Sequence, residues 1–191
     1  MTLKLKVSEE LEFINILKSK HARYIDGMRI IDKDAVNGDY VPPGAAMGKL
    51  DSSAKYGPVT RDYVAVGGAD STENTIPLKG LNESDWHNWQ VGDEIICDPG
   101  ESNEETATIT EIDEETGVLS VDGITTAHAE DVVIQKNDGS ATAKFVCTEL
   151  VDVSDGEDVP VGGITHGAVY AARMPNYDEI VKADLPLIAF E

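Results

Sequence analysis

The chain has 191 residues, of which 41% are hydrophobic, enough to bury a core and to form one or two domains. Acidic side chains outnumber basic ones 36 to 15, and the net charge of −21 opposes binding to nucleic acid or to a membrane surface, since both require Lys and Arg. No apolar run approaches the roughly 18 residues that span a bilayer, and residues 1–6 lack the apolar region of a signal peptide, so we expect synthesis in the cytoplasm without export.

The first predicted element is an amphipathic helix over residues 8–20. Ser8 suits the position that caps a helix, and the two glutamates after it suit the positive first turn. Three apolar side chains then recur at helical spacing: Leu11, Ile14 and Leu17. Lysines near the end of the segment suit the negative end of a helix. We expect this face to contact another part of the protein or a partner.

The middle of the chain is predicted to be β structure. Turn-forming sequences separate short runs that are rich in Val, Ile and Thr. These turns are Asn37-Gly38, Pro43-Gly44, Asp98-Pro99-Gly100, Thr116-Gly117, Asp122-Gly123, Asp138-Gly139 and Asp155-Gly156. Such regular spacing favours a small barrel or sandwich over a parallel sheet.

One β-hairpin is predicted within this region. Residues 108–112 and 118–121 both alternate apolar and polar side chains, and an acidic turn ending in Gly117 links them. Residues 90–96 read as a turn that enters another strand. We therefore expect residues 75–136 to form a compact barrel.

The distribution of charge predicts an inserted domain. Residues 1–69 carry 10 basic and 9 acidic side chains, residues 70–137 carry 2 and 17, and residues 138–191 carry 3 and 10. A strongly acidic segment is better placed in solvent than in a tight subunit contact, because like charges repel. We interpret 70–137 as an acidic β-rich domain inserted into a discontinuous core made of 1–69 and 138–191.

The C-terminal part is predicted to hold a short helix and a last strand. The helix would run from Tyr177 to Ala183 with Asn176 as its cap, and Pro186 would end it. An apolar strand, residues 187–190, would follow. The expected fold is thus mainly β: a small β-barrel or sandwich-like core with an inserted β-rich lobe and short helices near both termini.

No pattern in the sequence predicts an enzyme, a cofactor or a metal site. The glycines lack phosphate-loop spacing, and no serine lies in a nucleophile elbow. His128-Ala129-Glu130 resembles half of a zinc-deaminase motif, but the second half is missing. The acidic cluster over residues 101–115 favours a solvated surface over a calcium site. Cys97 and Cys147 have no metal-binding partners nearby and are expected to be inert thiols.

Two tryptophans lie three residues apart in the segment Trp86-His87-Asn88-Trp89. Aromatic side chains in such a pair form either part of the core or a binding platform for a sugar or a protein. Because the chain has few aromatic residues, core is the favoured interpretation. The platform supports an alternative function, a phage or cell-surface binding module that uses this region.

Two separate stretches of the chain resemble lambda-type bacteriophage head decoration proteins. The first is Val41-Pro42-Pro43-Gly44-Ala45-Ala46-Met47-Gly48-Lys49-Leu50, followed by residues 53–59. The second comprises residues 141–146, the acidic turn in 151–156, and the strand from Val161 to Val169 that contains His166-Gly167. The resemblance covers about residues 41–60 and 140–190, and 61–139 interrupt it.

The resemblance implies a small β-rich subunit that forms a homotrimer on the outer surface of an expanded phage head. Its partners would be the major capsid protein and further copies of itself, and its role would be capsid stabilisation in the virion. The family uses an N-terminal segment to grip the coat lattice, which implies that residues 1–40 form this arm. The candidate contact residues are Leu11, Ile14, Leu17, Pro42, Pro43, Leu187 and Phe190.

Overall fold

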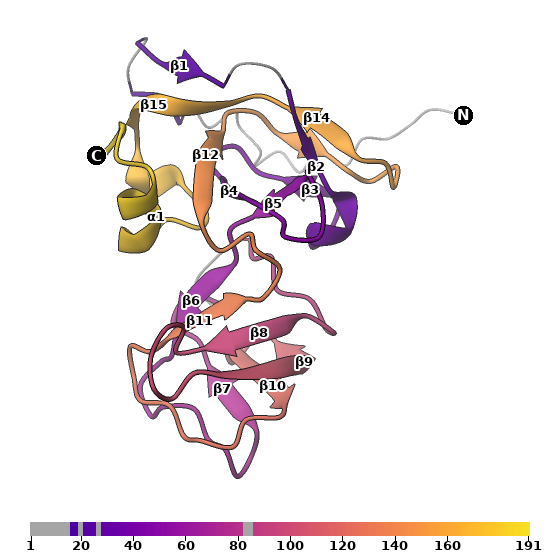
Figure 1. Ribbon diagram of the computed structural model, residues 1–191, viewed down its shortest axis with the longest axis vertical. Coiled ribbons are helices and arrows are strands. Elements are labelled where there is room, and N and C mark those ends of the chain that lie inside the picture. Colours follow the sequence, from indigo (N-terminus) through magenta and orange to yellow (C-terminus); the bar gives the residue numbers. More distant parts are fainter. Residues whose placement is uncertain (1–15, 19–20, 26–27, 82–85) are drawn as a thin grey trace.

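The computed structural model describes residues 16–18, 21–25, 28–81 and 86–191 of the chain. The fold is mainly β, with 40% strand and 7% helix, and its sheets are strongly curled. The sheets build two bodies that follow one another along the long axis of the molecule (Figure 1). The mainly β, barrel-like fold predicted from the sequence is therefore confirmed.

The first body is a sheet that joins strands from both ends of the chain. In the described part of the chain it has eight strands, in the order β1-β15-β12-β4-β5-β2-β14, with β16 paired to β15. The β2–β5 and β15–β16 pairs are parallel, and the other pairs are antiparallel. The strands are β1 (Arg23–Tyr24), β2 (Arg29–Ile31), β4 (Ala46–Lys49), β5 (Tyr56–Pro58), β12 (Ala143–Cys147), β14 (Val159–Val161), β15 (Gly163–Val169) and β16 (Ile188–Phe190).

Short elements complete the first body. Two further strands pair with each other, and two single-turn 3-10 helices and one α-helix lie against the sheet. These elements are η1 (Lys33–Ala35), β3 (Tyr40–Val41), β13 (Val151–Asp152), η2 (Ala171–Arg173) and α1 (Glu179–Asp184).

The central strands of this sheet are buried on both faces. In β12, Phe145 and Val146 are neighbours, yet they belong to two different hydrophobic clusters. The same is true of Ala46 and Met47 in β4, because successive side chains of a strand point to opposite faces. Burial on both faces explains the short apolar runs Ala46-Met47 and Phe145-Val146-Cys147 within these strands.

The second body is a barrel formed by the middle of the chain. Among the described residues its strands have the order β6-β11-β8-β9-β10-β7. Val64 and Leu78 form a bridge between the two ends of this order, and Lys79 N–H donates to the Tyr63 carbonyl at 2.9 Å, so the sheet closes on itself. The strands are β6 (Arg61–Tyr63), β7 (Thr75–Pro77), β8 (Glu94–Cys97), β9 (Glu105–Asp113), β10 (Val118–Asp122) and β11 (Val133–Lys136).

The predicted hairpin is confirmed as β9 and β10, with Val118 opposite Asp113. The register shifts between Ser120 and Val121, which marks a β-bulge. Ile109 and Ile112 are three residues apart and would lie on opposite faces of a regular strand. The bulge adds one residue between them, so both side chains contact the barrel core.

The predicted turns are also confirmed, because the glycine in each of the seven turn sequences has a positive φ angle. At Gly117, which ends the hairpin turn, φ is 73°, a conformation that other residues rarely adopt. Cys97 and Cys147 are fully buried, and burial raises the pKa of their thiols to about 12 and about 11. The expectation of inert cysteines agrees with this burial.

The helix predicted over residues 8–20 is wrong where the structure describes it, over 16–18. Leu17 forms an antiparallel bridge with Val169, and Lys18 N–H donates to the Ala168 carbonyl at 2.9 Å. Edge pairing with β15 satisfies the backbone here and buries Ile16 in the core. The remainder of the predicted helix, including Leu11 and Ile14, lies outside the described residues.

The C-terminal helix and strand are confirmed as α1 and β16, with one correction at the cap. The N-cap is Asp178, whose carboxylate accepts from Val181 N–H at 2.6 Å. Asn176 does not cap the helix because its amide group bonds to the backbone of Ala46 and Val59 in the sheet. The helix therefore begins at Glu179, two residues after the predicted start at Tyr177, because Asn176 bonds to the sheet instead.

The two bodies are joined where the chain enters and leaves the barrel. The barrel comprises residues 61–136, so its first strand precedes residue 70, where charge alone placed the start of the insertion. Lys136 N–H donates to the Thr60 carbonyl at 3.0 Å, so the two connections lie side by side.

Candidate functional site

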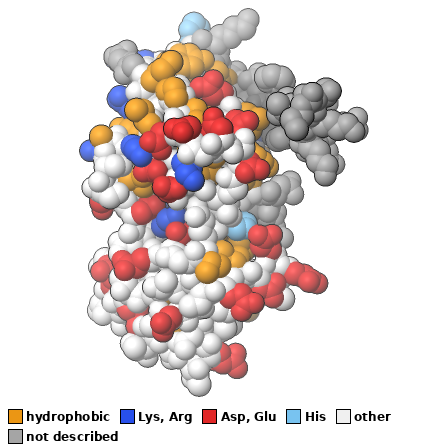
Figure 2. Space-filling model, turned by 90° about the vertical axis from the view of Figure 1, so that its right-hand side faces the viewer, with side chains coloured by type: hydrophobic (Ala, Val, Ile, Leu, Met, Phe, Trp, Pro, Cys, Tyr) orange, Lys and Arg blue, Asp and Glu red, His pale blue; other side chains and the backbone are white. Residues whose placement is uncertain are grey.

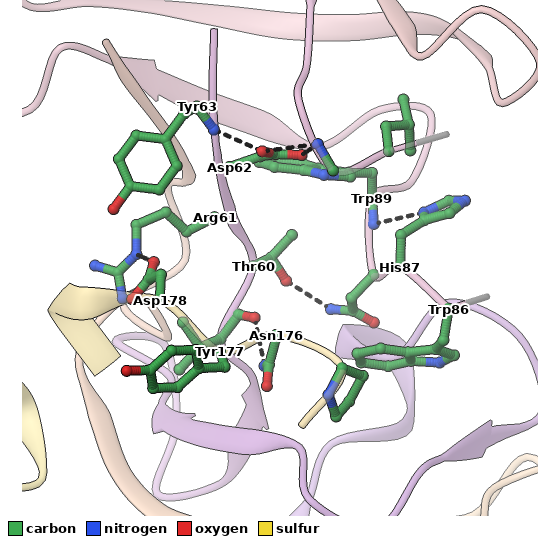
Figure 3. Close-up of a pocket in the computed structure, with 15 residues that line it drawn as sticks. Thr60, Arg61, Asp62, Tyr63, Trp86, His87, Trp89, Asn176, Tyr177 and Asp178 are labelled. Carbon is green, nitrogen blue, oxygen red and sulfur yellow. Dashed lines mark hydrogen bonds and ion pairs between the residues drawn. The ribbon is translucent and has the colours of Figure 1, made fainter. Parts of the chain in front are cut away.

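A groove lies at the junction between the first sheet and the barrel. Three segments that are distant in the sequence line it: residues 59–63, residues 86–89 and residues 175–178. The groove has a volume of about 150 Å³ and is partly open to solvent. Figure 3 shows Trp86 at one end, Thr60 in the middle, and Arg61, Tyr63 and Tyr177 at the other end.

Asn88 fixes the segment 86–89 against the first body. It is buried, its amide nitrogen donates to the Ala35 carbonyl and to Thr60 Oγ1, both at 2.9 Å, and its amide oxygen accepts from Asn37 N–H at 2.7 Å. One side chain thus satisfies three groups from two other segments. The barrel loop is held rigidly to the sheet at this point.

The third wall of the groove is held by Asn176 and Asp178. The amide of Asn176 accepts from Ala46 N–H at 2.8 Å and donates to the carbonyls of Ala46 and Val59. Asp178 caps α1 and also accepts a hydrogen bond from Arg61 Nε at 2.7 Å. This ion pair connects the first barrel strand with the C-terminal helix.

Arg61 provides an unusual polar group in the groove. Its side chain is only 3% exposed, and its Nη2 atom is buried without a hydrogen-bond partner. A buried, unsatisfied donor is uncommon in folded proteins, because leaving it unbonded costs about 1–3 kcal/mol. Burial, and then the nearby charge of Asp178, raise the pKa of Tyr63, so its phenol keeps its proton and can donate or accept.

The two tryptophans have different roles. Trp89 is buried in the barrel core, whereas Trp86 is half-buried and lines the groove. Between them, His87 Nδ1 accepts from Trp89 N–H at 3.3 Å, which leaves Nε2 as the donor to Glu114 at 3.0 Å. The core interpretation therefore holds for Trp89, and Trp86 lies where a ligand could contact it.

The candidate contact residues do not form one cluster. Leu17 and Phe190 are half-buried and pack on the core of the first body, where Phe190 contacts the ring of Tyr177. Pro42 and Pro43 are half-buried in the turn before Gly44, and Leu187 is exposed just before β16. Leu11 and Ile14 are outside the described residues.

Among the residues that the structure describes, large exposed apolar side chains are more numerous on the first body than on the barrel. Figure 2 shows most of the hydrophobic, Lys and Arg side chains of this face over the upper part of the molecule, whereas Asp and Glu side chains lie over both parts. On the first body the large exposed side chains are Tyr24, Met28, Ile30, Leu150 and Leu187. On the barrel they are Val66 and Val91.

Neither a metal site nor a membrane-spanning helix is found in the described ranges. Within residues 16–18, 21–25, 28–81 and 86–191, no group of three His, Cys, Asp or Glu side chains is arranged to hold a metal ion. In the same ranges no helix combines the length and the apolar character needed to cross a membrane.

Comparisons with protein-family models, with curated proteins and with solved structures found no match to this chain. Sequence reasoning found the Trp86–Trp89 segment but missed Arg61, Asn176 and Asp178 as parts of the same groove. Arg61 and Asp178 are 117 positions apart in the sequence, with most of the barrel and several strands of the first sheet between them. No local pattern links them, because only the pairing of distant strands brings them together.

Proposed function

We propose that this protein decorates the outer surface of an expanded phage head as a homotrimer and stabilises the shell. The observation that carries the proposal is the meeting of the two stretches that resemble head decoration proteins. β4, from residues 41–60, pairs with β12, which pairs with β15, both from residues 140–190. Strands from the two stretches are therefore neighbours in one continuous sheet. The barrel is connected to this sheet at a single junction.

The surface of the first body suits contact with other proteins. Met28 is 74% exposed and Ile30 is 48% exposed, and both lie near the strand pair β2–β14. Apolar groups of this kind gain free energy when a partner covers them, at about 25 cal/mol per Å² of buried apolar surface. These exposed side chains therefore favour the first body as the surface that contacts the shell.

The acidic barrel suits a position that faces solvent. It carries most of the excess negative charge of the chain, and bringing copies of it together would be opposed by repulsion. If the first body lies on the shell, the barrels of a trimer point outward. A cement protein then acts by adding interface area, and about 800 Å² per partner is typical of a specific contact.

The first test is the mass of the purified protein by size-exclusion chromatography with light scattering, before and after mixing with expanded heads. We expect a homotrimer, either free or assembled on the shell, and an increase in the melting temperature of the shell. A stable monomer that does not bind expanded shells contradicts the proposal.

The contact surface is tested with two pairs of substitutions. Met28→Ser with Ile30→Ser should weaken binding to shells, since both changes remove exposed apolar area from the first body. Val66→Ser with Val91→Ser is the matched control, because those side chains are 80% and 63% exposed on the barrel. Equal binding by the two double variants would show that the first body is not the contact surface.

The role of the N-terminal segment is tested by deleting residues 1–15. This truncation keeps Ile16, which is buried in the core of the first body, and its melting temperature is measured to check that the subunit still folds. We expect the truncated protein to bind shells weakly and to stabilise them less. If it decorates and stabilises shells as well as the full chain does, the grip does not belong to this segment.

A further inference from the structure

The groove at the junction has the size and the openness of a site for part of a chain-like ligand. Its volume of about 150 Å³ is sufficient for one six-membered ring. The groove is partly open to solvent, and it extends from the Arg61 end to the Trp86 end (Figure 3). A ligand could therefore bury one ring and continue along the groove.

The polar groups of the groove favour a ligand with hydroxyl or carbonyl oxygens. Arg61 Nη2 is a buried donor without an acceptor, and a ligand oxygen at this position would satisfy it. The phenol of Tyr63 lines the same end of the groove and remains protonated. In contrast, the amides of Asn88 and Asn176 are fully engaged with the protein and serve only to hold the walls.

The charges in and around the groove disfavour an anionic ligand. Asp178 already neutralises Arg61 at 2.7 Å, and Asp62, whose carboxylate accepts from Gly80 N–H, adds a further negative charge. The whole chain has a net charge of −21, which repels anions. A neutral ligand with many hydroxyl groups suits these surroundings best.

The aromatic side chains define the rest of the ligand. Trp86 is half-buried at one end, and Tyr177 and Tyr63 lie at the other, so the two ends both offer aromatic surface. Aromatic faces pack well on flat apolar surfaces such as the C–H face of a sugar ring. A second ring of the same glycan, at the opposite end of the groove from Trp86, can present its hydroxyl groups to Arg61.

We propose that the groove binds a short neutral glycan, with a sugar hydroxyl accepting from Arg61 Nη2 and a sugar ring packed on Trp86. This activity is independent of the capsid contact, because the groove and the exposed apolar surface of the first body are formed by different residues. A decorated shell would then carry many copies of a weak glycan-binding site.

The proposal is tested with a microarray that holds neutral oligosaccharides together with sialylated and sulfated ones. Neutral glycans that bind are then titrated against the full chain by isothermal calorimetry. We expect binding to neutral glycans with a dissociation constant of about 1 mM or tighter. Trp86→Ala and Arg61→Lys should each weaken it by about tenfold, and Arg61→Lys keeps the charge beside Asp178.

Tyr24→Ala is the matched control, because Tyr24 is an exposed aromatic residue on the first body, outside the groove. This variant should bind glycans as the unmodified chain does. Each variant is checked for its melting temperature, so that loss of binding is not confused with loss of fold. Absence of binding to any neutral glycan, binding to acidic glycans alone, or equal binding by all three variants overturns the proposal.

Discussion

Asn88 connects a loop of the barrel to two segments of the chain at the junction. Its amide bonds to Ala35, Asn37 and Thr60, and all of these groups are buried or partly buried. Removing the amide leaves a backbone carbonyl and a backbone N–H without their partners in the protein interior. Such groups are costly because they also lose their bonds to water.

We therefore expect Asn88→Ala to lower the free energy of unfolding by about 2–3 kcal/mol. Urea denaturation, followed by tryptophan fluorescence, measures this loss. Asn137→Ala is the control, since Asn137 is exposed and should change stability by less than about 0.5 kcal/mol. Similar losses in the two variants would show that Asn88 does not hold the junction.

Glu105 is a carboxyl of the barrel whose pKa differs strongly from its ordinary value. Burial alone would raise the pKa of its carboxyl, but hydrogen bonds from Thr125, Thr126 and His128 outweigh burial and lower the pKa from 4.5 to about 2. A carboxyl with a depressed pKa in the folded state stabilises the protein above its unfolded pKa. This contribution is lost as the pH falls from about 4.5 toward 2.

In Glu105→Gln, part of the decrease in stability between about pH 5 and pH 2 should disappear, because the variant cannot gain the proton. The measurement is the free energy of unfolding across this pH range. Glu111→Gln, an exposed change on the same strand, should retain the decrease, since it leaves the bonds to Glu105 intact. An unchanged slope in Glu105→Gln would contradict the role of this carboxyl.

At the level of the elements, the close approach of β4 to the loop before β12 depends on one glycine. A Cβ atom on Gly48 would lie 1.8 Å from the carbonyl oxygen of Ser140, so backbone would have to move. Both residues are buried within the first body. Pairing of β4 with β12 therefore requires glycine at this position.

Gly48→Ala should accordingly destabilise the protein by about 3 kcal/mol, a magnitude typical of severe overpacking. Thermal unfolding, followed by circular dichroism, measures the effect. Gly162→Ala is the control, because the nearest atom to its Cβ, Glu149 Oε1, lies at an ordinary contact distance of 3.6 Å. A Gly48→Ala variant as stable as Gly162→Ala would show that the strands can separate without loss.

Elements with local signals were predictable from the sequence. The hairpin of β9 and β10 has alternating apolar and polar residues and a glycine in its turn. The helix α1 has acidic residues at its start, and a proline follows shortly after its end. Residues 16–18 were mistaken for helix because Leu17 has helical spacing to earlier apolar residues. Pairing with Val169, far along the chain, determines its conformation instead.

The groove was predictable only in part, for the same reason. The pair Trp86 and Trp89 is noticeable in a sequence with few aromatic residues. The sequence does not show that Trp86 lines the groove and Trp89 lies in the core, because this depends on how one loop crosses the barrel. Arg61 reads as an ordinary surface residue in the sequence. In the folded protein it is buried and paired with Asp178, a residue 117 positions later in the chain.

At the level of the whole molecule, the barrel is attached in a way that allows its removal. Thr60 and Lys136 are joined by a backbone hydrogen bond, so a short linker can replace residues 61–136 without strain. The first body keeps two hydrophobic clusters made of its own residues. The contacts that it loses include those of Asn88, of Arg61 and of Glu94 with Asn137.

Replacing residues 61–136 by a short Gly/Ser linker should leave a folded protein with a lower melting temperature that still binds expanded shells. It should not bind glycans, because two walls of the groove are removed. Calorimetry and sedimentation with shells measure these properties. Loss of cooperative unfolding in the shortened chain would show that the first body depends on the barrel for its fold.

The hydrogen bond between Thr60 and Lys136 also has a consequence for the order of folding. β4 must find β12 across roughly 95 residues, and closing a loop of this length is slow and entropically unfavourable. A barrel that has already folded reduces the effective loop to about 17 residues, which lowers the cost of closure by about 1.5 kcal/mol. Since the ribosome delivers residues 61–136 before β12 and β15, the barrel can form during synthesis and place β12 beside β4 as it emerges.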